Sequence, residues 1–148
     1  MNVLIPPVQL ALWLGAQQLV ARRSPRTPAA SGALRVVGGV ALAAAAAGGA
    51  DALRRFLSRG TTWHPWDLDG ATHLVTDGPN RVSRNPMYAG MALGLAGTGL
   101  LTGRPWSALA AAGFVATVTP QVRREEAALE AIFGDAWRAY ARRVRRWV

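Results

Sequence analysis

Four apolar blocks separated by charged or proline-containing breaks constrain the fold of this chain most strongly. The blocks begin near residues 3, 36, 87 and 105, and most hold about 15 to 18 residues. A helix needs about 20 apolar residues to cross about 30 Å of hydrocarbon, so each block is slightly short of a full span. The pattern favours an all-α integral membrane bundle of about four transmembrane helices, with a soluble helical bundle as the alternative.

Prolines, glycines and charged residues in the sequence predict where the helices end. Arginines, prolines and serines make residues 22–31 a polar loop, and the stretch from Arg59 to Asn85 has no sustained period, which indicates a long interfacial loop. Pro120 can kink the fourth helix. The predicted spans are 3–20, a second helix from about 33 with its core at 36–50, 87–101 and 105–118.

A fifth helix is predicted after Glu125, broken near Gly134. Apolar residues recur there at spacings of three and four, opposite several arginines, which is typical of an amphipathic helix on a membrane surface. Anchoring to anionic headgroups is the first interpretation, and closing over a bound cofactor is the alternative. The apolar positions are Leu129, Ile132, Phe133, Trp137, Tyr140, Val144 and Trp147.

Composition limits the partners. The chain has 17 basic residues, all arginine, and a net charge of +9. These arginines flank the apolar blocks, which favours anionic membrane lipids over nucleic acid as the partner. The absence of cysteine excludes disulfides and thiolate sites, and two histidines make a metal site improbable.

The arginines also predict an orientation. With four spans, twelve arginines lie on the side of both termini and five on the other side. The positive-inside rule then predicts a multi-pass protein whose termini, and whose polar site, face the cytoplasm.

Small residues on the third block predict close helix packing. Gly90 and Gly94 form one GxxxG pair, and Gly99 and Gly103 form another. Such pairs let helices approach closely in lipid and would permit a homodimer. The alternative is that residues 97–99 (GTG) open space for a ligand; the spacing does not match a dinucleotide fingerprint.

Polar groups stand at one end of a predicted helical hairpin. A polar turn, residues 78–90, runs directly into the third block, and Glu125 and Glu126 follow the fourth. Because a tight turn joins these two helices, their far ends should lie side by side. The residues brought together would be Arg84, Asn85, Tyr88, Gln121, Glu125 and Glu126. The alternative is a solvated carboxylate pair, or one paired with Arg123 or Arg124, beside headgroup contacts.

Four segments resemble the isoprenylcysteine carboxyl methyltransferase and phospholipid methyltransferase family. They are residues 76–81 (TDGPNR), 83–90 (SRNPMYAG), 125–126 (EE) and 133–140 (FGDAWRAY), and the resemblance spans roughly 60–147. It implies one all-helical membrane methyltransferase domain over 1–148, with two N-terminal helices in 1–58 and the cofactor-binding half in 59–148.

The resemblance also implies S-adenosylmethionine as cofactor, bound without a Rossmann domain. By position, its contacts fall on His73, Leu74, Val75, Asn80, Asn85, Pro86, Met87, Tyr88, Gly90, Glu125 and Glu126. Glu125 would hold a polar part of the cofactor, and Asn85 and Tyr88 would orient it. Glu125 and Asn85 are therefore the predicted catalytic residues, and Gln121 and Arg84 the predicted substrate contacts.

Two residues depart from the family pattern. Asn85 replaces the usual histidine of an Arg-His-Pro-x-Tyr motif, and an amide can still donate and accept hydrogen bonds. Gln121 stands where the prenylcysteine enzymes have a substrate-side arginine, which weakens the case for a prenylcysteine carboxylate. The predicted acceptor is lipophilic or small; phospholipid amines and small thiols are the alternatives within the class, and an anionic-lipid-binding module is the alternative outside it.

Overall fold

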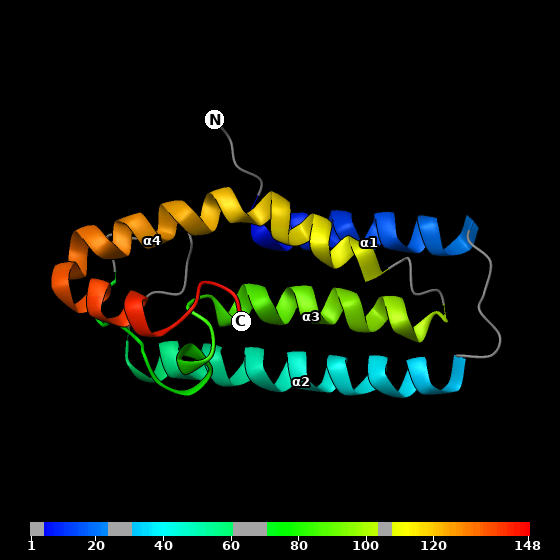
Figure 1. Ribbon diagram of the computed structural model, residues 1–148, viewed down its shortest axis with the longest axis horizontal. Coiled ribbons are helices and arrows are strands. Elements are labelled where there is room, and N and C mark those ends of the chain that lie inside the picture. Colours follow the sequence, from blue (N-terminus) through cyan, green and yellow to red (C-terminus); the bar gives the residue numbers. More distant parts are fainter. Residues whose placement is uncertain (1–4, 24–30, 61–70, 104–107) are drawn as a thin grey trace.

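The computed structural model describes residues 5–23, 31–60, 71–103 and 108–148, and all regular structure in these ranges is helical (Figure 1). The elements are α1 (Pro6–Arg23), α2 (Ser31–Ser58), the short 3₁₀ helix η1 (Gly78–Arg81), α3 (Pro86–Leu101) and α4 (Leu109–Arg143). The all-α prediction is confirmed for these ranges.

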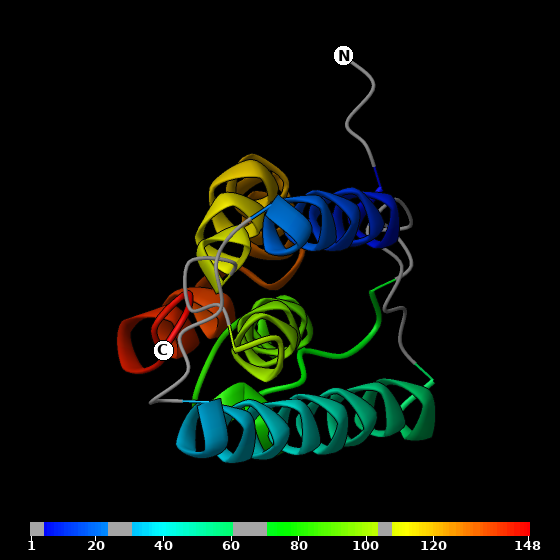
Figure 2. The ribbon, with the colours of Figure 1, turned by 90° about the vertical axis from the view of Figure 1, so that its right-hand side faces the viewer.

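Successive long helices run in opposite directions, as expected for two helical hairpins (Figure 1). In both ribbon views α3 lies between α2 on one side and the pair α1 and α4 on the other (Figures 1 and 2). The start of α3 and the second half of α4 therefore share one end of the bundle, which is where the polar motifs lie.

Glycines allow α2 and α3 to touch through their backbones. A Cβ at Gly38 would lie 2.6 Å from the carbonyl oxygen of Gly97, and one at Gly97 would lie 2.8 Å from that of Gly38. Gly99 is equally close to Ala108. Of the glycines predicted to pack, Gly99 makes this close contact, and a Cβ on Gly90 or Gly94 would lie 3.5 or 3.9 Å from Ala45 of α2, so the packing interpretation is confirmed for these three. The alternative that residues 97–99 open space for a ligand is wrong, because α2 and Ala108 occupy the space beside Gly97 and Gly99.

The core of the bundle lies between α3 and α4, where Leu95, Phe114, Val118 and Val122 are almost fully buried. One polar link crosses this apolar region. Gln17 of α1, 1% exposed, donates from Nε2 to the carbonyl oxygen of Leu95 at 2.6 Å and accepts the hydroxyl of Thr98 at 2.8 Å. An amide buried in this way is tolerated because both of its ends are paired.

The fourth helix differs from the prediction. Instead of ending near Val118 ahead of a separate amphipathic helix, α4 continues through Pro120, whose ring is exposed and so does not disturb the core. The break lies at Gly134, where φ is 51°, a value that favours glycine. The chain reverses there and its last turns return toward the start of α3 (Figure 1).

Other predicted boundaries shift by a few residues. α1 begins at Pro6 and continues to Arg23, and α2 continues past its predicted core at 36–50 to Ser58. The segment between α2 and α3 therefore keeps its predicted bounds, residues 59–85. Residues 61–70 of that loop, and Arg104 and Pro105 of the predicted turn, lie outside the described ranges.

Among the residues that the structure describes, one helix, α2, is long and apolar enough to cross a membrane by length and composition, over residues 32–58. At 1.5 Å per residue its 28 residues span about 42 Å, whereas the 16 apolar residues of α3 span about 24 Å. Membrane character therefore rests on α2, and four full spans are not established.

Candidate functional site

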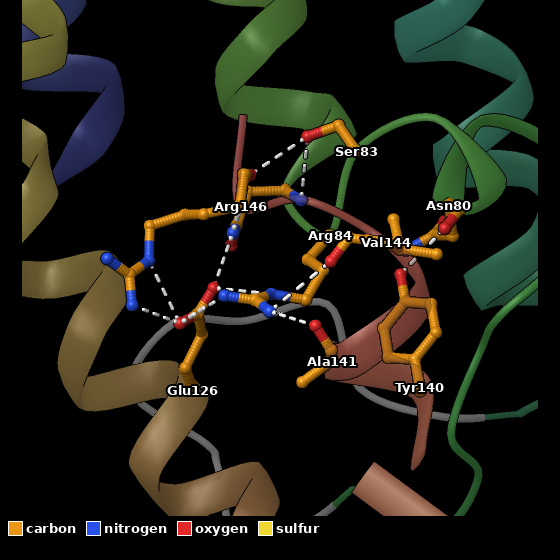
Figure 3. Close-up of polar contacts among 9 residues, drawn as sticks. Asn80, Ser83, Arg84, Glu126, Tyr140, Ala141, Val144 and Arg146 are labelled. Atoms are coloured by element: carbon orange, nitrogen blue, oxygen red, sulfur yellow. Dashed lines mark hydrogen bonds and ion pairs between the residues drawn. The ribbon is translucent and has the colours of Figure 1, made fainter. Parts of the chain in front are cut away.

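Glu126 of α4 lies at the centre of a polar network at the shared end of α3 and α4 (Figure 3). Arg84 donates from Nε and Nη2 to its two carboxylate oxygens at 3.1 and 3.2 Å. Arg146 donates from Nε and Nη2 to Oε2 at 2.9 and 2.7 Å, and Asn85 Nδ2 donates to Oε1 at 3.1 Å. Five donors thus compensate a carboxylate that is only 7% exposed.

Arg84 also makes several other contacts within the protein. Its Nη1 donates to the carbonyl oxygens of Ala141 and Val144 at 2.9 and 3.3 Å, and its backbone N–H to that of Arg145 at 2.9 Å. Its guanidinium carbon lies 5.8 Å from the ring centre of buried Trp137. These contacts join the loop before α3 to the end of α4; the predicted substrate role of Arg84 stays a prediction.

The chain after α4 folds back onto the motif through its backbone (Figure 3). The carbonyl oxygen of Arg146 accepts from the Ser83 hydroxyl at 3.1 Å and from Asn85 Nδ2 at 3.2 Å. The Tyr140 hydroxyl donates to the carbonyl oxygen of Asn80 at 2.7 Å. These contacts hold Asn85 in place and turn buried Tyr140 inward, toward the loop before α3.

Glu125 belongs to a separate, smaller group of polar atoms. Consecutive helix residues point about 100° apart, so the two glutamates face different surroundings. Tyr88 donates its hydroxyl to Glu125 Oε1 at 2.7 Å, and Gln121 Nε2 donates to the same oxygen at 3.0 Å. No cation pairs with Glu125 among the described residues, and Gln121 Oε1 is buried without a partner there.

The pKa values of the two adjacent carboxyls are shifted in opposite directions. Burial raises the pKa of Glu125, only partly offset by the hydrogen bonds from Tyr88 and Gln121. Burial also acts on Glu126, but the donors from Arg146 and Arg84 outweigh it and hold its pKa below the usual range. Glu126 is therefore a stable anion within the fold, whereas Glu125 lacks a compensating positive charge.

The structure thus confirms the predicted convergence of Arg84, Asn85 and Tyr88 with Gln121, Glu125 and Glu126. Arg123 and Arg124, the predicted alternative partners of the glutamates, are both exposed, and it is Arg84 and Arg146 that pair with Glu126.

The predicted cofactor contacts in the loop before α3 differ in how deeply they are buried. Val75 and Asn80 are buried, Leu74 is partly buried, and His73 is exposed. Asn80 Oδ1 is a buried acceptor without a partner among the described residues.

Pro86 and Met87 form the first turn of α3 and are partly buried. Gly90 faces α2, because a Cβ on it would lie 3.5 Å from the Ala45 carbonyl oxygen. Its position supports a packing role.

A second charged cluster fixes the loop to the end of α2. Asp77 accepts from Arg55 Nη1 at 2.8 Å and from Arg59 Nη2 at 2.7 Å through Oδ2, and Arg55 also pairs with Asp51 at 2.8 Å. The Arg55 guanidinium occupies the space that a side chain on Gly78 would need, and Gly78 has a φ of 56°. The positive φ favours glycine here, and a larger side chain would also displace the Arg55 guanidinium.

Sequence reasoning missed three residues that build the site, namely Asp77, Tyr140 and Arg146. Arg146 was one of several C-terminal arginines, and the signal available in the sequence was Gly134, at which the helix was predicted to break. In the structure Gly134 has a positive φ, and the chain after it returns to Glu126. Within the described ranges no three His, Asp or Glu side chains form a metal-binding group.

A protein-family model described as phospholipid methyltransferase matches residues 34–136, which is more than half of the chain. The match includes α2, α3 and both glutamates. Neither a curated protein nor a solved structure matches the chain.

Proposed function

Because this chain belongs to the phospholipid methyltransferase family, we propose that it transfers the methyl group of S-adenosylmethionine to a lipophilic acceptor at a membrane interface. The family is one of methyltransferases, which supports an enzyme; the cofactor, the acceptor and the site residues are part of the proposal.

The observation that carries the proposal is the environment of Glu125. Its carboxylate lies beside Tyr88 and Gln121, has no cationic partner among the described residues, and has a raised pKa because it is buried. A buried anion of this kind is costly unless a cation compensates it. S-adenosylmethionine carries a sulfonium and an α-ammonium group, so it fits this need.

Methyl transfer from a sulfonium is an in-line displacement: the acceptor forms the new bond to carbon as the carbon–sulfur bond breaks, and the electron pair leaves with sulfur. Positioning provides most of the acceleration, and effective molarities can reach about 10⁵ M. Glu125 would hold the cationic part of the cofactor, and Tyr88 would fix the Glu125 carboxylate by its 2.7 Å hydrogen bond. Asn85, held by Glu126 and Arg146, would orient the cofactor.

We infer a phospholipid or another lipophilic amine as the acceptor. The long apolar α2 supports a lipid-phase substrate. Gln121 provides no positive charge for a prenylcysteine carboxylate, and its unpaired Oε1 is an acceptor suited to an amine N–H donor. Small thiols remain a second acceptor class for the assay.

The same proposal includes an integral membrane location with cytoplasmic termini and anionic lipids around the arginine-rich end. α2 contributes a span, and we infer that α1, α3 and the first part of α4 lie in the membrane with it. A homodimer through α2 or α3 is permitted, although Gly38 and Gly97 already pack against each other within one chain and so do not face a second copy.

The test uses purified protein in lipid nanodiscs with labelled S-adenosylmethionine and a panel of phospholipid amines, thiols and prenylated carboxylates. Glu125→Gln should abolish cofactor binding measured by calorimetry and methyl transfer. The control Glu130→Gln removes an exposed carboxylate on the same helix and should keep both.

Full cofactor affinity in Glu125→Gln would remove Glu125 from the site. If S-adenosylmethionine neither binds nor shifts the melting temperature of the wild-type protein, the non-enzymatic alternative, an anionic-lipid-binding module, takes the place of this proposal.

A further inference from the structure

A surface cavity of about 370 Å³ opens between the loop before η1 and the last turn of α4. Small-molecule sites in proteins have volumes of roughly 300–1,000 Å³, so this one suits a headgroup-sized ligand rather than a whole lipid. Its lining residues are Thr76, Asp77, Arg81, Tyr140, Arg143 and Val144.

The lining carries an excess of positive charge. Asp77 Oδ2 is paired with Arg55 and Arg59, which do not line the cavity, and Asp77 Oδ1 is buried without a partner among the described residues. Arg81 and Arg143 are exposed, and neither has a carboxylate partner among the described residues. Two cations that line the cavity, Arg81 of η1 and Arg143 of α4, thus lack an anionic partner.

The remaining lining residues make the cavity a fixed part of the site. The Tyr140 ring is held by its bond to Asn80, and the Val144 carbonyl oxygen accepts from Arg84, which binds Glu126. The cavity therefore shares a wall with the network around Glu126.

We propose that this cavity binds a phosphate-type oxyanion, with Arg81 and Arg143 as its cationic ligands. Guanidinium groups present paired N–H donors that match phosphate oxygens, so two arginines on facing elements can hold one phosphodiester. The occupant is the phosphate of a phospholipid headgroup or a free phosphate. Identifying it with the acceptor lipid's own phosphate rests on the proposed function.

Binding is measured by calorimetry on the full chain in nanodiscs made of a neutral glycolipid, so that no other phosphate competes. The probes are glycerophosphoethanolamine and inorganic phosphate in separate titrations. Arg81→Gln and Arg143→Gln should each weaken binding about tenfold, since a hydrogen bond to a charged group has roughly this effect. Added salt should weaken it further, because the site is exposed. Arg142→Gln, an exposed neighbour that does not line the cavity, should bind like the wild type.

Glycerophosphoethanolamine binding well above that of inorganic phosphate identifies a lipid headgroup as the occupant, and equal binding identifies phosphate alone. No binding by the wild type, or equal losses in Arg142→Gln and Arg143→Gln, overturns the site. S-adenosylmethionine affinity, measured in the same variants, should be unchanged, so the failure of this site and the failure of the methyltransferase proposal give different results.

Discussion

Glu126 and Glu125 are neighbours in sequence with opposite energetic roles. Glu126 receives five hydrogen bonds, four of them from two arginines, whereas Glu125 receives two from uncharged groups. A buried charge with enough donors supports the fold, and one without them is a cost that a ligand can relieve. This difference separates a structural glutamate from a ligand-binding one.

Replacing Glu126 should weaken the fold. In Glu126→Gln, Arg84 and Arg146 lose their anion while Arg84 remains largely buried, which should cost about 3 kcal/mol in the free energy of unfolding at pH 7. Denaturant titration in detergent measures this, with the exposed Glu130→Gln as a control expected within about 0.5 kcal/mol of the wild type.

Acid should remove the difference between Glu126→Gln and the wild type. Because the pKa of Glu126 is lowered in the fold, its contribution is present above its ordinary pKa of 4.5 and is lost as pH falls through the lower folded value. A difference unchanged at pH 3 would contradict this assignment.

The contribution of Glu125 to stability should depend on pH in the opposite sense to that of Glu126. Its pKa is raised by burial, so the protonated form favours folding below the ordinary pKa of 4.5, and that contribution is lost as pH rises through the folded value. Glu125→Gln keeps the acceptor for Tyr88 without the charge, and its melting temperature should exceed that of the wild type at pH 8. The gap should close toward pH 4.5; a lower melting temperature at pH 8 would mean that Glu125 has a cationic partner.

At the scale of elements, the contact of α2 with α3 depends on which glycine faces the neighbouring helix. Gly38→Ala would place a Cβ 2.6 Å from the Gly97 carbonyl oxygen and 2.9 Å from the Leu101 nitrogen, both backbone atoms that cannot rotate away. Overpacking of this kind costs about 1–3 kcal/mol. Gly39→Ala has open space around it and should be neutral or stabilising by up to about 1 kcal/mol. Equal effects in thermal unfolding would show that the two helices do not meet at Gly38.

The end of α4 acts on the site through the reversal at Gly134. Without that positive φ the helix would continue straight, and neither Tyr140 nor Arg146 would meet the loop before α3. The segment after Gly134 covers the motif and buries Trp137 and Tyr140 against it, and its anchoring to anionic lipid stays a prediction. The cost of a glycine inside a helix is offset by these contacts.

For the whole molecule, local sequence signals predicted the helices better than they predicted which side chains pair with one another. Apolar blocks and the short connection between α3 and α4 were enough to bring Tyr88 near Glu125, because a hairpin brings its ends together. The pairing of Glu126 with Arg84 and Arg146 was not predictable in this way. It depends on a chain reversal far along the sequence, and any of several arginines could have satisfied the same charge.

The last prediction concerns how the chain is oriented in a membrane. Because the chain has no cysteine, single cysteines can be introduced and labelled one at a time. Val40 lies on the outer face of α2 and is 64% exposed in the isolated chain, so lipid should cover it. Arg23 ends α1 and Arg142 lies in the last turn of α4, and both are exposed. These two helix ends lie toward opposite ends of the bundle (Figure 1). With an impermeant maleimide on whole cells, Arg23→Cys should react at once and Arg142→Cys only after permeabilisation, because the arginine-rich end is expected in the cytoplasm.

Val40→Cys should stay unlabelled in both conditions, since a thiol in hydrocarbon neither ionises nor meets the reagent. Labelling of Val40→Cys at the rate of Arg142→Cys would place α2 in water and favour the soluble helical bundle, and exchange of the Arg23 and Arg142 results would invert the orientation.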